Sequence, residues 1–332
     1  MPDTDPSDPA LVVPGAAEIA TARARLAGIA HVTPVLTSAT LDARLGIRVF
    51  LKAENFQRTG SFKFRGAVNA VAALPEAIRR FGVVAYSSGN HAQAVAAAAR
   101  HFGIPAVIVM PNDAPPPKRA ATAEYGARIV TYDRYTEDRV AMARRIAARL
   151  GATLVPPFDH HDVVAGQASA AAELLDAVGP LDAVLAPVGG GGLLAGTALA
   201  LAATCPGAAA IGVEPEAGND GQQSLARGMR VTIPVPRSLA DGALTQCLGA
   251  LPFAVLRGQG ARIVTVPDAA LRPAMRFLAE RMKLVVEPTG ALGLAALQTG
   301  AFAAPAGARV GVILSGGNTE FLPEPPTGLP PS

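Results

Sequence analysis

AVLAPVGGGGLLAGTALALAATCPGAAAIGV, residues 183–213, carries no charged side chain and decides the fold class. Four consecutive glycines and two prolines divide it into a strand, a loop, a helix and a second strand. No piece reaches the roughly 20 apolar residues that a membrane-spanning helix requires. The stretch therefore predicts a buried strand–helix–strand unit of a water-soluble protein, with no membrane partner.

The alternation of short apolar runs and Ala/Leu-rich helices extends over most of the chain. A first series of strands reads RVFLKAEN, GVVAYSS, AVIVMP, ARIVTY and ATLVPP, with helices such as 91–102 and 136–150 between them. A second series covers 181–188, 209–215, 261–267 and 310–316. Two series predict an α/β fold with two open, twisted, parallel or mixed sheets flanked by helices. We expect the strand near 48–55, which has no partner before it, to join the later sheet.

The order of the two series predicts the domain organisation. We expect a small α/β domain, residues 82–158, inserted in a large domain, residues 16–81 and 159–322, with a cleft between them. Residues 1–15 are predicted to form a disordered tail and residues 323–332 a Pro-rich tail. The N-terminus lacks the basic start and apolar run of a secretory signal, which favours a cytoplasmic protein.

Composition excludes several classes of function. Of the 332 residues 50% are hydrophobic, and 29 Lys and Arg against 26 Asp and Glu give a net charge of +3. No basic block would follow a phosphate backbone, so we expect no nucleic-acid partner. The two cysteines, Cys205 and Cys247, lack CxxC spacing and predict neither a disulfide framework nor a zinc site.

Four strand-to-helix turns are rich in small residues. They read TGSFKFRG (59–66), SSGNHAQ (87–93), GGGGLLAG (189–196) and SGGNTE (315–320). Each places backbone N–H groups at a helix start, where anions bind, and ligands of such folds collect at the carboxyl ends of strands. Together the turns predict a site for a polyanionic or zwitterionic small molecule.

The glycine run is compatible with more than one kind of ligand. Its backbone can approach a phosphate closely. A nicotinamide-dependent oxidoreductase is one alternative, because Glu214 ends the next strand, where a ribose-binding acid would lie. However, a GxGxxG motif beginning at Gly189 or Gly190 would need glycine where the chain has Leu194 or Ala195. A non-catalytic amino-acid-binding module is a second alternative.

The few lysines favour a reactive amine. The chain has only four, Lys52, Lys63, Lys118 and Lys283, whereas Arg supplies the other positive charges. Lys63 lies between Phe62 and Phe64, and apolar neighbours favour the neutral amine that condenses with an aldehyde. The alternative is a structural lysine whose aliphatic chain covers apolar surface while its charged amine reaches water.

Six motifs in order resemble the pyridoxal-phosphate enzymes of the tryptophan-synthase β-subunit fold (fold type II), specifically the serine/threonine dehydratase and serine racemase group. They are GSFKFRGA, SSGNHAQ, PVGGGGLLAG, VEPEAGND, ERMKLVVEPTGA and LSGGN, between about residues 16 and 320. The resemblance implies a Schiff base on Lys63, stacking by Phe62, a ring-hydroxyl contact from Asn90 and Ser315 facing the pyridine nitrogen. The implied cofactor-binding set is Phe62, Lys63, Asn90, Gly189, Gly190, Gly191, Gly192, Leu193, Glu287 and Ser315, with the phosphate on the Gly189–Leu193 backbone.

The resemblance also implies how the substrate is bound and transformed. The implied substrate-binding residues are Ser87, Ser88, Gly89, Asn90 and His91. Lys63 would take the Cα proton, and loss of a β-hydroxyl would lead to a 2-oxo acid and ammonia. Ser88 lies, by the resemblance, on the cofactor face opposite Lys63. It would either relay a proton and racemise the substrate or bind only the carboxylate.

A divalent cation is implied by the same resemblance. Its ligands would be Glu214, the backbone carbonyl of Gly218 and Asp220, hard oxygen donors that suit Mg²⁺, or alternatively Ca²⁺ or Mn²⁺. The run Asp159–Asp162, DHHD, predicts a polar loop between the domains. Adjacent side chains of an extended chain point to opposite sides, so its two histidines would not share one metal ion.

These observations predict an ammonia-lyase that acts on L-threonine or L-serine. A serine or aspartate racemase and a hydroxyaspartate ammonia-lyase are the alternatives on the same scaffold, and a homodimer is usual for the resemblance. Where the family has AGQGT, the chain has AGQAS at 165–169. We expect a turn there, with altered substrate contacts, and we expect no regulatory domain after LSGGN.

Overall fold

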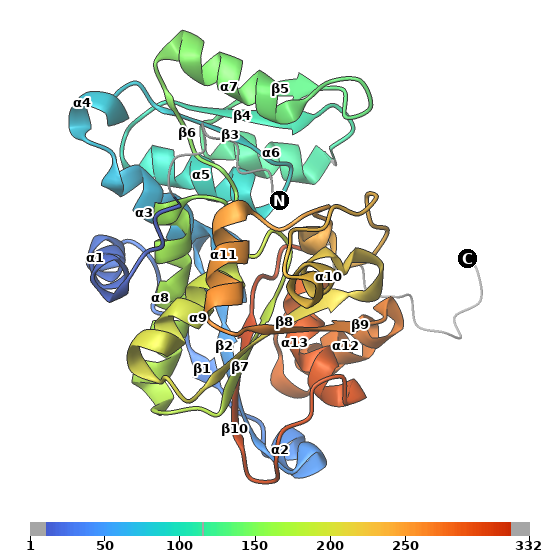
Figure 1. Ribbon diagram of the computed structural model, residues 1–332. Helices are drawn as coiled ribbons and strands as arrows, with labels where there is room; N and C mark the ends of the chain where they lie inside the picture. The colour runs from blue at the N-terminus through green and yellow to red at the C-terminus, as the bar shows by residue number, and fades with distance from the viewer. Residues whose placement is uncertain (1–10, 115, 320–332) are drawn as a thin grey trace, which may run out of the picture.

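The strands of the computed structural model, which describes residues 11–114 and 116–319, form two separate sheets (Figure 1). The mixed sheet and the parallel sheet, both flanked by helices, confirm the predicted α/β fold class. Most of the two predicted tails lies outside the described residues, and 11–15 contain neither helix nor strand. No helix in the described parts of the chain is both long and apolar enough to cross a membrane.

The larger sheet has six strands in the order β1-β2-β10-β7-β8-β9. Their bounds are β1 Val35–Leu36, β2 Arg48–Ala53, β7 Ala183–Pro187, β8 Ala209–Pro215, β9 Arg262–Val266 and β10 Arg309–Leu314. Only β1 is antiparallel to its neighbour. Val310 of β10 pairs with Val49 of β2 on one side and Ala183 of β7 on the other. The early strand does join the later sheet, as the sequence predicts.

Helices cover both faces of the larger sheet. One face packs against α2 (Ala39–Leu45), α12 (Leu271–Met282) and α13 (Pro288–Thr299). The other packs against α1 (Ala16–Leu26), α8 (His161–Val178), α9 (Gly192–Thr204) and α11 (Ala250–Gly258). The charge-free stretch 183–213 therefore supplies two central strands and the buried helix between them. Helix α10 (Asp220–Arg227) lies beside β9.

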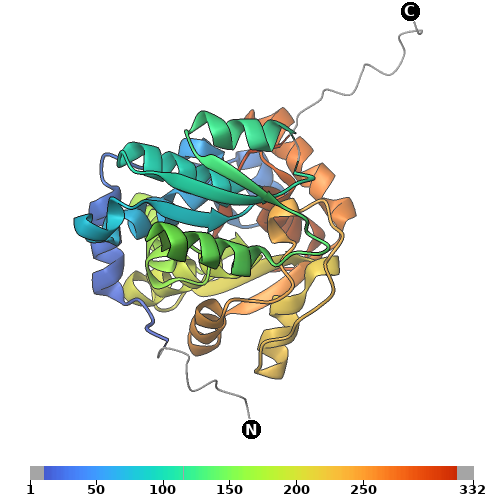
Figure 2. The same ribbon diagram turned by 90° about the horizontal axis from the view of Figure 1, so that it is seen from above.

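The smaller sheet has four parallel strands in the order β5-β4-β3-β6. The strands are β3 Val83–Tyr86, β4 Ala106–Pro111, β5 Arg128–Tyr132 and β6 Thr153–Leu154. Four helices lie in the same part of the chain: α4 Glu76–Arg79, α5 Asn90–His101, α6 Pro116–Glu124 and α7 Arg139–Leu150. Helix α5 packs on one face and α7 on the other (Figure 2). The apolar side of α3 (Lys63–Ala73) joins the core beneath this smaller sheet.

Residues 165–169 are not the turn that the sequence predicts. They lie inside α8 and are buried, and none of them lines the cavity that contains Lys63. Their small side chains serve helix packing: a Cβ added at Gly166 would come within 2.7 Å of Gly66 Cα on α3. A Cβ at Gly196 of α9 would come within 2.6 Å of the Ala168 nitrogen. A run of small residues thus marks close helix contacts here and not a substrate-binding loop.

A buried group of four charged side chains joins β2, α3 and α8. Arg65, two residues after Lys63, donates hydrogen bonds to both oxygens of Glu54 at 2.7 and 2.8 Å. It donates to both oxygens of Glu173 at 2.7 Å each. Lys52 donates to Glu173 at 2.6 Å, so two positive and two negative charges are neutralised together. The Arg65 and Glu54 side chains are fully buried. This group, the buried ion cluster, fixes the first turn of α3.

The buried ion cluster predicts a large stability difference between two arginine substitutions. Arg65→Met leaves two buried carboxylates without their guanidinium and should lower the free energy of unfolding by about 3–5 kcal/mol. Arg23→Met is the control, because the Arg23–Asp176 pair is 41% and 58% exposed and contributes about 0–1 kcal/mol. Urea denaturation followed by circular dichroism measures both. Equal losses in the two variants would contradict the structural role of the cluster.

Candidate active site

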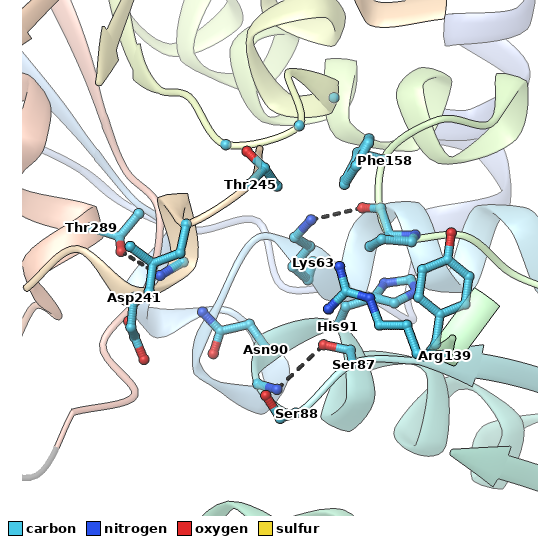
Figure 3. Close-up of a pocket in the computed structure, with 18 of the residues that line it drawn as sticks. Lys63, Ser87, Ser88, Asn90, His91, Arg139, Phe158, Asp241, Thr245 and Thr289 are labelled. Carbon is cyan, nitrogen blue, oxygen red and sulfur yellow. Dashed lines mark hydrogen bonds between the residues drawn. The ribbon is translucent and has the colours of Figure 1, made fainter. Parts of the chain in front are cut away.

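The four small-residue turns meet at one cavity of about 650 Å³ between the two sheets (Figure 3). The residues that the resemblance assigns to cofactor and substrate line this one cavity: Phe62, Lys63, Ser87, Ser88, Gly89, Asn90, His91, Gly189, Gly190, Gly191, Gly192, Leu193, Glu287 and Ser315. Parallel strands of both sheets end here, which explains why segments far apart in sequence come together. The individual roles of these residues stay predictions.

Lys63 presents a primary amine to the cavity from the first turn of α3. Its Nζ donates a 2.7 Å hydrogen bond to the Pro157 carbonyl and lies 5.2 Å from the centre of the Phe62 ring. Burial lowers the pKa of Lys63 from 10.5 to about 8, although the nearby Glu287 carboxylate acts in the opposite direction. An amine with this pKa is partly neutral near pH 7, and the neutral amine is the nucleophile.

The glycine loop, Gly189–Gly192, connects β7 to α9 and leaves no room for side chains. Gly191 has φ +89°, a left-handed conformation that favours glycine. A Cβ at Gly189 would lie 2.9 Å from the Gly242 carbonyl oxygen, and one at Gly190 would overlap the Phe158 ring. The loop has no side chains that could cover the first N–H groups of α9, so these groups face the cavity. A helix N-terminus exposed in this way binds phosphate groups.

The turn 87–91 places a second helix N-terminus at the cavity. Helix α5 starts at Asn90, and the Gly89 N–H is 3.3 Å from Ser87 Oγ. His91 is buried, its Nε2 lies 2.9 Å from the Val155 carbonyl, and burial lowers its pKa to about 3. His91 is therefore neutral, with Nε2 as the donor, because a carbonyl only accepts. This end of the cavity suits a carboxylate.

Three polar side chains join the two sheets across the cavity floor. Asn90 Nδ2 donates to Glu287 at 2.8 Å, and Asn318 Nδ2 donates to Asn90 Oδ1 at 2.8 Å. Burial raises the pKa of Glu287 to about 8, with Asp241 acting in the same direction. Glu287 precedes α13, whose first residue is Pro288, so its position is set by the helix start. The three side chains link α5 to segments next to α13 and β10.

Ser315 presents a buried hydroxyl without a partner. It follows β10, is 1% exposed, and its Oγ makes no hydrogen bond with any described residue. Its backbone carbonyl accepts from the Phe62 N–H at 3.0 Å, which ties it to the residue before Lys63. A buried hydroxyl is usually satisfied, so this one fits a ligand atom. With the Lys63 amine, the Phe62 ring and the glycine loop, the cavity fits a phosphorylated aromatic aldehyde.

Several cavity residues were missed by the sequence analysis. They are Arg139, Phe158, Asp241, Thr245 and Thr289. Phe158 follows the strand β6, and Arg139 begins α7 after β5, so their places at the ends of strands were the signals available. The loop that carries Asp241 and Thr245 has no readable motif. Lys118 of α6 forms a 2.5 Å ion pair with Asp241, which links the two walls of the cavity.

The predicted metal ligands lie outside this cavity. Glu214 accepts hydrogen bonds from the N–H groups of Gly221 and Gln222 at 2.9 Å each. Burial raises the pKa of Glu214 to about 8 and that of Asp220 to about 7. One Asp220 oxygen is buried and has no partner among the described residues. No cluster of three or more His, Cys, Asp or Glu side chains suited to a metal occurs in 11–114 and 116–319.

The position of Glu214 also bears on the dinucleotide alternative. A ribose-binding acid must face the ligand cradled by the glycine loop, whereas Glu214 is fully buried and bound to the start of α10. The third glycine of a GxGxxG motif is also missing, because the chain has Leu194 and Ala195 at the positions where it could stand. The oxidoreductase interpretation therefore loses the residue on which it rested.

Comparison with known proteins identifies the family. The family model described as "Pyridoxal-phosphate dependent enzyme" matches residues 27–316. An L-threo-3-hydroxyaspartate ammonia-lyase from Pseudomonas sp is 56% identical over 92% of this chain and 95% of that protein. A serine racemase from Schizosaccharomyces pombe is 50% identical over 94% and 96%. The solved structure of maize serine racemase, 38% identical over 93% of this chain and 95% of that one, has a TM-score of 0.90.

The match covers both sheets, the glycine loop and the segment with Lys63. The resemblance of the six motifs is therefore confirmed at the level of family and fold. The chain belongs to the pyridoxal-phosphate dependent enzymes of fold type II.

Proposed function

We propose that this protein is a pyridoxal-phosphate dependent ammonia-lyase whose substrate is L-threo-3-hydroxyaspartate. The observation that carries the proposal is the 56% identity, over nearly the whole chain, to a protein with that activity. This replaces L-threonine or L-serine, the substrates that the sequence analysis favours, by one of its alternatives. Both choices share a β-hydroxyl on an α-amino acid, which is the leaving group of the elimination.

Lys63 has two tasks in this proposal. Its neutral amine attaches the cofactor, and after release it is the base that takes the Cα proton. The bound cofactor supplies an electron-withdrawing ring that makes this proton acidic. Burial keeps the Lys63 pKa near 8, so the amine accepts and returns protons close to neutral pH.

The other cavity residues bind and orient. The N-terminus of α5, with Ser87, Ser88 and Gly89, would hold the α-carboxylate. The glycine loop would hold the cofactor phosphate through the N-terminus of α9. Ser315 would meet the ring nitrogen with a neutral hydroxyl, which cannot hold that nitrogen protonated as a carboxylate would. This arrangement favours expulsion of the β-hydroxyl over transamination.

Racemisation is the second candidate activity. The observation in its favour is the 50% identity to a serine racemase. Racemisation requires a proton donor on the face opposite Lys63, the role that Ser88 would have if it relays a proton. Elimination requires a base on one face only. The proposed function also includes a homodimer, which rests on the family resemblance, and a cytoplasmic location, which fits the free thiols of Cys205 and Cys247.

We also propose that Glu214, the Gly218 carbonyl and Asp220 hold a divalent cation, Mg²⁺ first. Two buried carboxylates with raised pKa values and one unpartnered oxygen fit an oxygen-ligated ion. The ion would stabilise the loop between β8 and α10. It would lie outside the cavity, so its contribution is to the fold.

The substrate assignment is tested by comparing amino acids on the holoenzyme. L-threo-3-hydroxyaspartate should give oxaloacetate and ammonia with a kcat/KM about 10- to 100-fold above those for L-serine and L-threonine. One charged hydrogen bond to the extra carboxylate accounts for a factor of this size. A coupled assay for the 2-oxo acid measures all three. A higher kcat/KM for L-threonine would contradict the assignment.

Lys63→Ala should abolish covalent cofactor attachment and nearly all turnover while the fold is kept. Residual activity should be reduced by several orders of magnitude, because both the attachment point and the base are removed. Borohydride reduction of the wild type followed by peptide mapping should find the label on Lys63. Label on Lys52, Lys118 or Lys283 would overturn the assignment.

Removal of the cation should lower thermal stability. A cation at 100 times its dissociation constant contributes about 2.7 kcal/mol to the free energy of unfolding. A thermal scan of the wild type should therefore show a lower Tm with chelator and recovery with Mg²⁺. The variant Glu214→Gln with Asp220→Asn should have the same Tm in both conditions. An unchanged wild-type Tm after complete chelation would remove the cation from the account.

A further inference from the structure

The crossover from the smaller sheet to the larger one is fastened by an aspartate that does not line the cavity. Residues 155–160 connect β6 to α8 and include the start of the DHHD run. The Asp159 carboxylate accepts hydrogen bonds from the N–H groups of Ala250 and Leu251, both at 2.9 Å. Ala250 is the first residue of α11 and lies 91 positions later in the chain. This contact therefore ties the crossover to the helices that cover the larger sheet.

Helix α11 depends on the same contact for its N-terminal cap. Its own N-cap residue, Gly249, has no side chain that could accept these hydrogen bonds. A Cβ at Gly249 would lie 2.8 Å from the carboxylate carbon of Asp159, so glycine makes room for the aspartate. A carboxylate satisfies the free N–H groups at a helix start and matches the partial positive charge there. The cap of α11 is thus supplied by a distant segment.

The two residues before Asp159 form part of the cavity wall. The Pro157 carbonyl accepts the 2.7 Å hydrogen bond from Lys63 Nζ. The Phe158 ring occupies the space that a side chain at Gly190 would need. Both Phe158 and Lys63 are labelled in Figure 3, which also shows the hydrogen bond of the Lys63 amine. The crossover therefore contacts both the reactive amine and the glycine loop.

The start of α11 supports the glycine loop as well. The Gly249 N–H donates to the Gly190 carbonyl at 3.1 Å. A Cβ at Gly191 would lie 2.9 Å from the Cβ of Pro252, in the first turn of α11. The glycine loop is thus held between the crossover on one side and α11 on the other. Asp159 is the side chain that joins these two supports.

We infer that Asp159 is a positioning residue for the cofactor: its cap on α11 holds Phe158 against the glycine loop and the Pro157 carbonyl against the Lys63 amine. Pro156 and Pro157 each fix a φ angle, so a displacement at Asp159 is passed along a stiff segment. The Asp159 side chain is exposed, and its truncation opens no cavity in the core. The inference rests on membership of the pyridoxal-phosphate family and holds for any amino-acid substrate.

The test measures cofactor binding to the apoenzyme without amino acid. Asp159→Ala should raise the dissociation constant of pyridoxal phosphate about 10-fold, the factor to which the loss of one helix cap corresponds. Asp159→Asn, which keeps one acceptor oxygen, should recover part of this loss. The visible absorbance of the attached cofactor measures the constant in each variant.

Asp182→Ala is the matched control. Asp182 is also exposed and also accepts a backbone N–H from a distant residue, Arg309, at 2.7 Å. However, it precedes β7, at the end of the strand opposite the cavity. Its dissociation constant for pyridoxal phosphate should equal that of the wild type. An equal loss of affinity in Asp182→Ala and Asp159→Ala would contradict the inference.

A double variant shows whether Asp159 acts through its neighbour. Phe158→Leu should weaken cofactor binding by itself, and the further addition of Asp159→Ala should have a much smaller effect than in the wild type, because residues that act as one unit are not additive. Losses that multiply in the double variant would overturn the inference. A lower Tm of Asp159→Ala with unchanged cofactor affinity would overturn it too. None of these results depends on turnover of hydroxyaspartate, so the proposed function can fail independently.

Discussion

The pairing of Arg65 with two buried carboxylates is the constraint on which the position of the reactive amine depends. A guanidinium at this depth is tolerated only if its hydrogen bonds are satisfied, and Glu54 and Glu173 satisfy both of its edges. The first carboxylate follows β2 and the second belongs to α8. Arg65 therefore holds the end of β2, the start of α3 and the middle of α8 together. Lys63, two residues earlier on the same helix, is placed at the cavity by that arrangement.

The chemistry of the cavity follows from what its walls leave unpaired. The glycine loop exposes helix N–H groups, Ser315 keeps a buried hydroxyl without a partner, and the Lys63 amine loses part of its charge through burial. Each feature would cost stability in an ordinary core. Under the proposed assignment of the site, a cofactor with a phosphate, an aldehyde and a ring nitrogen would satisfy all of them together.

Much of this site is predictable because it depends on backbone. The turns with Lys63, Gly189 and Ser315 follow apolar strands, and parallel strands bring their carboxyl ends together, so their convergence can be expected from the sequence. The AGQAS segment misleads for a related reason: Gly166 is small because α3 passes close by, and small residues in a helix contact look like those of a turn. Asp241 pairs with Lys118 across the cavity, and the sequence does not record such contacts between distant side chains. The choice of substrate depends on such contacts and is therefore the least predictable part.

The central claim is that burial in this cavity turns Lys63 into an amine that is reactive near neutral pH. The rate at which apoenzyme attaches pyridoxal phosphate, followed by the visible absorbance of the product from pH 6 to 10, tests it most directly. With a pKa of about 8, the neutral form of Lys63 accumulates as pH rises through 8, and roughly a tenth of the Lys63 side chains are neutral at pH 7. We expect the rate to rise with pH and to level off above an apparent pKa of about 8. A rate that continues to climb toward pH 10.5, as for an ordinary exposed lysine, would contradict the account.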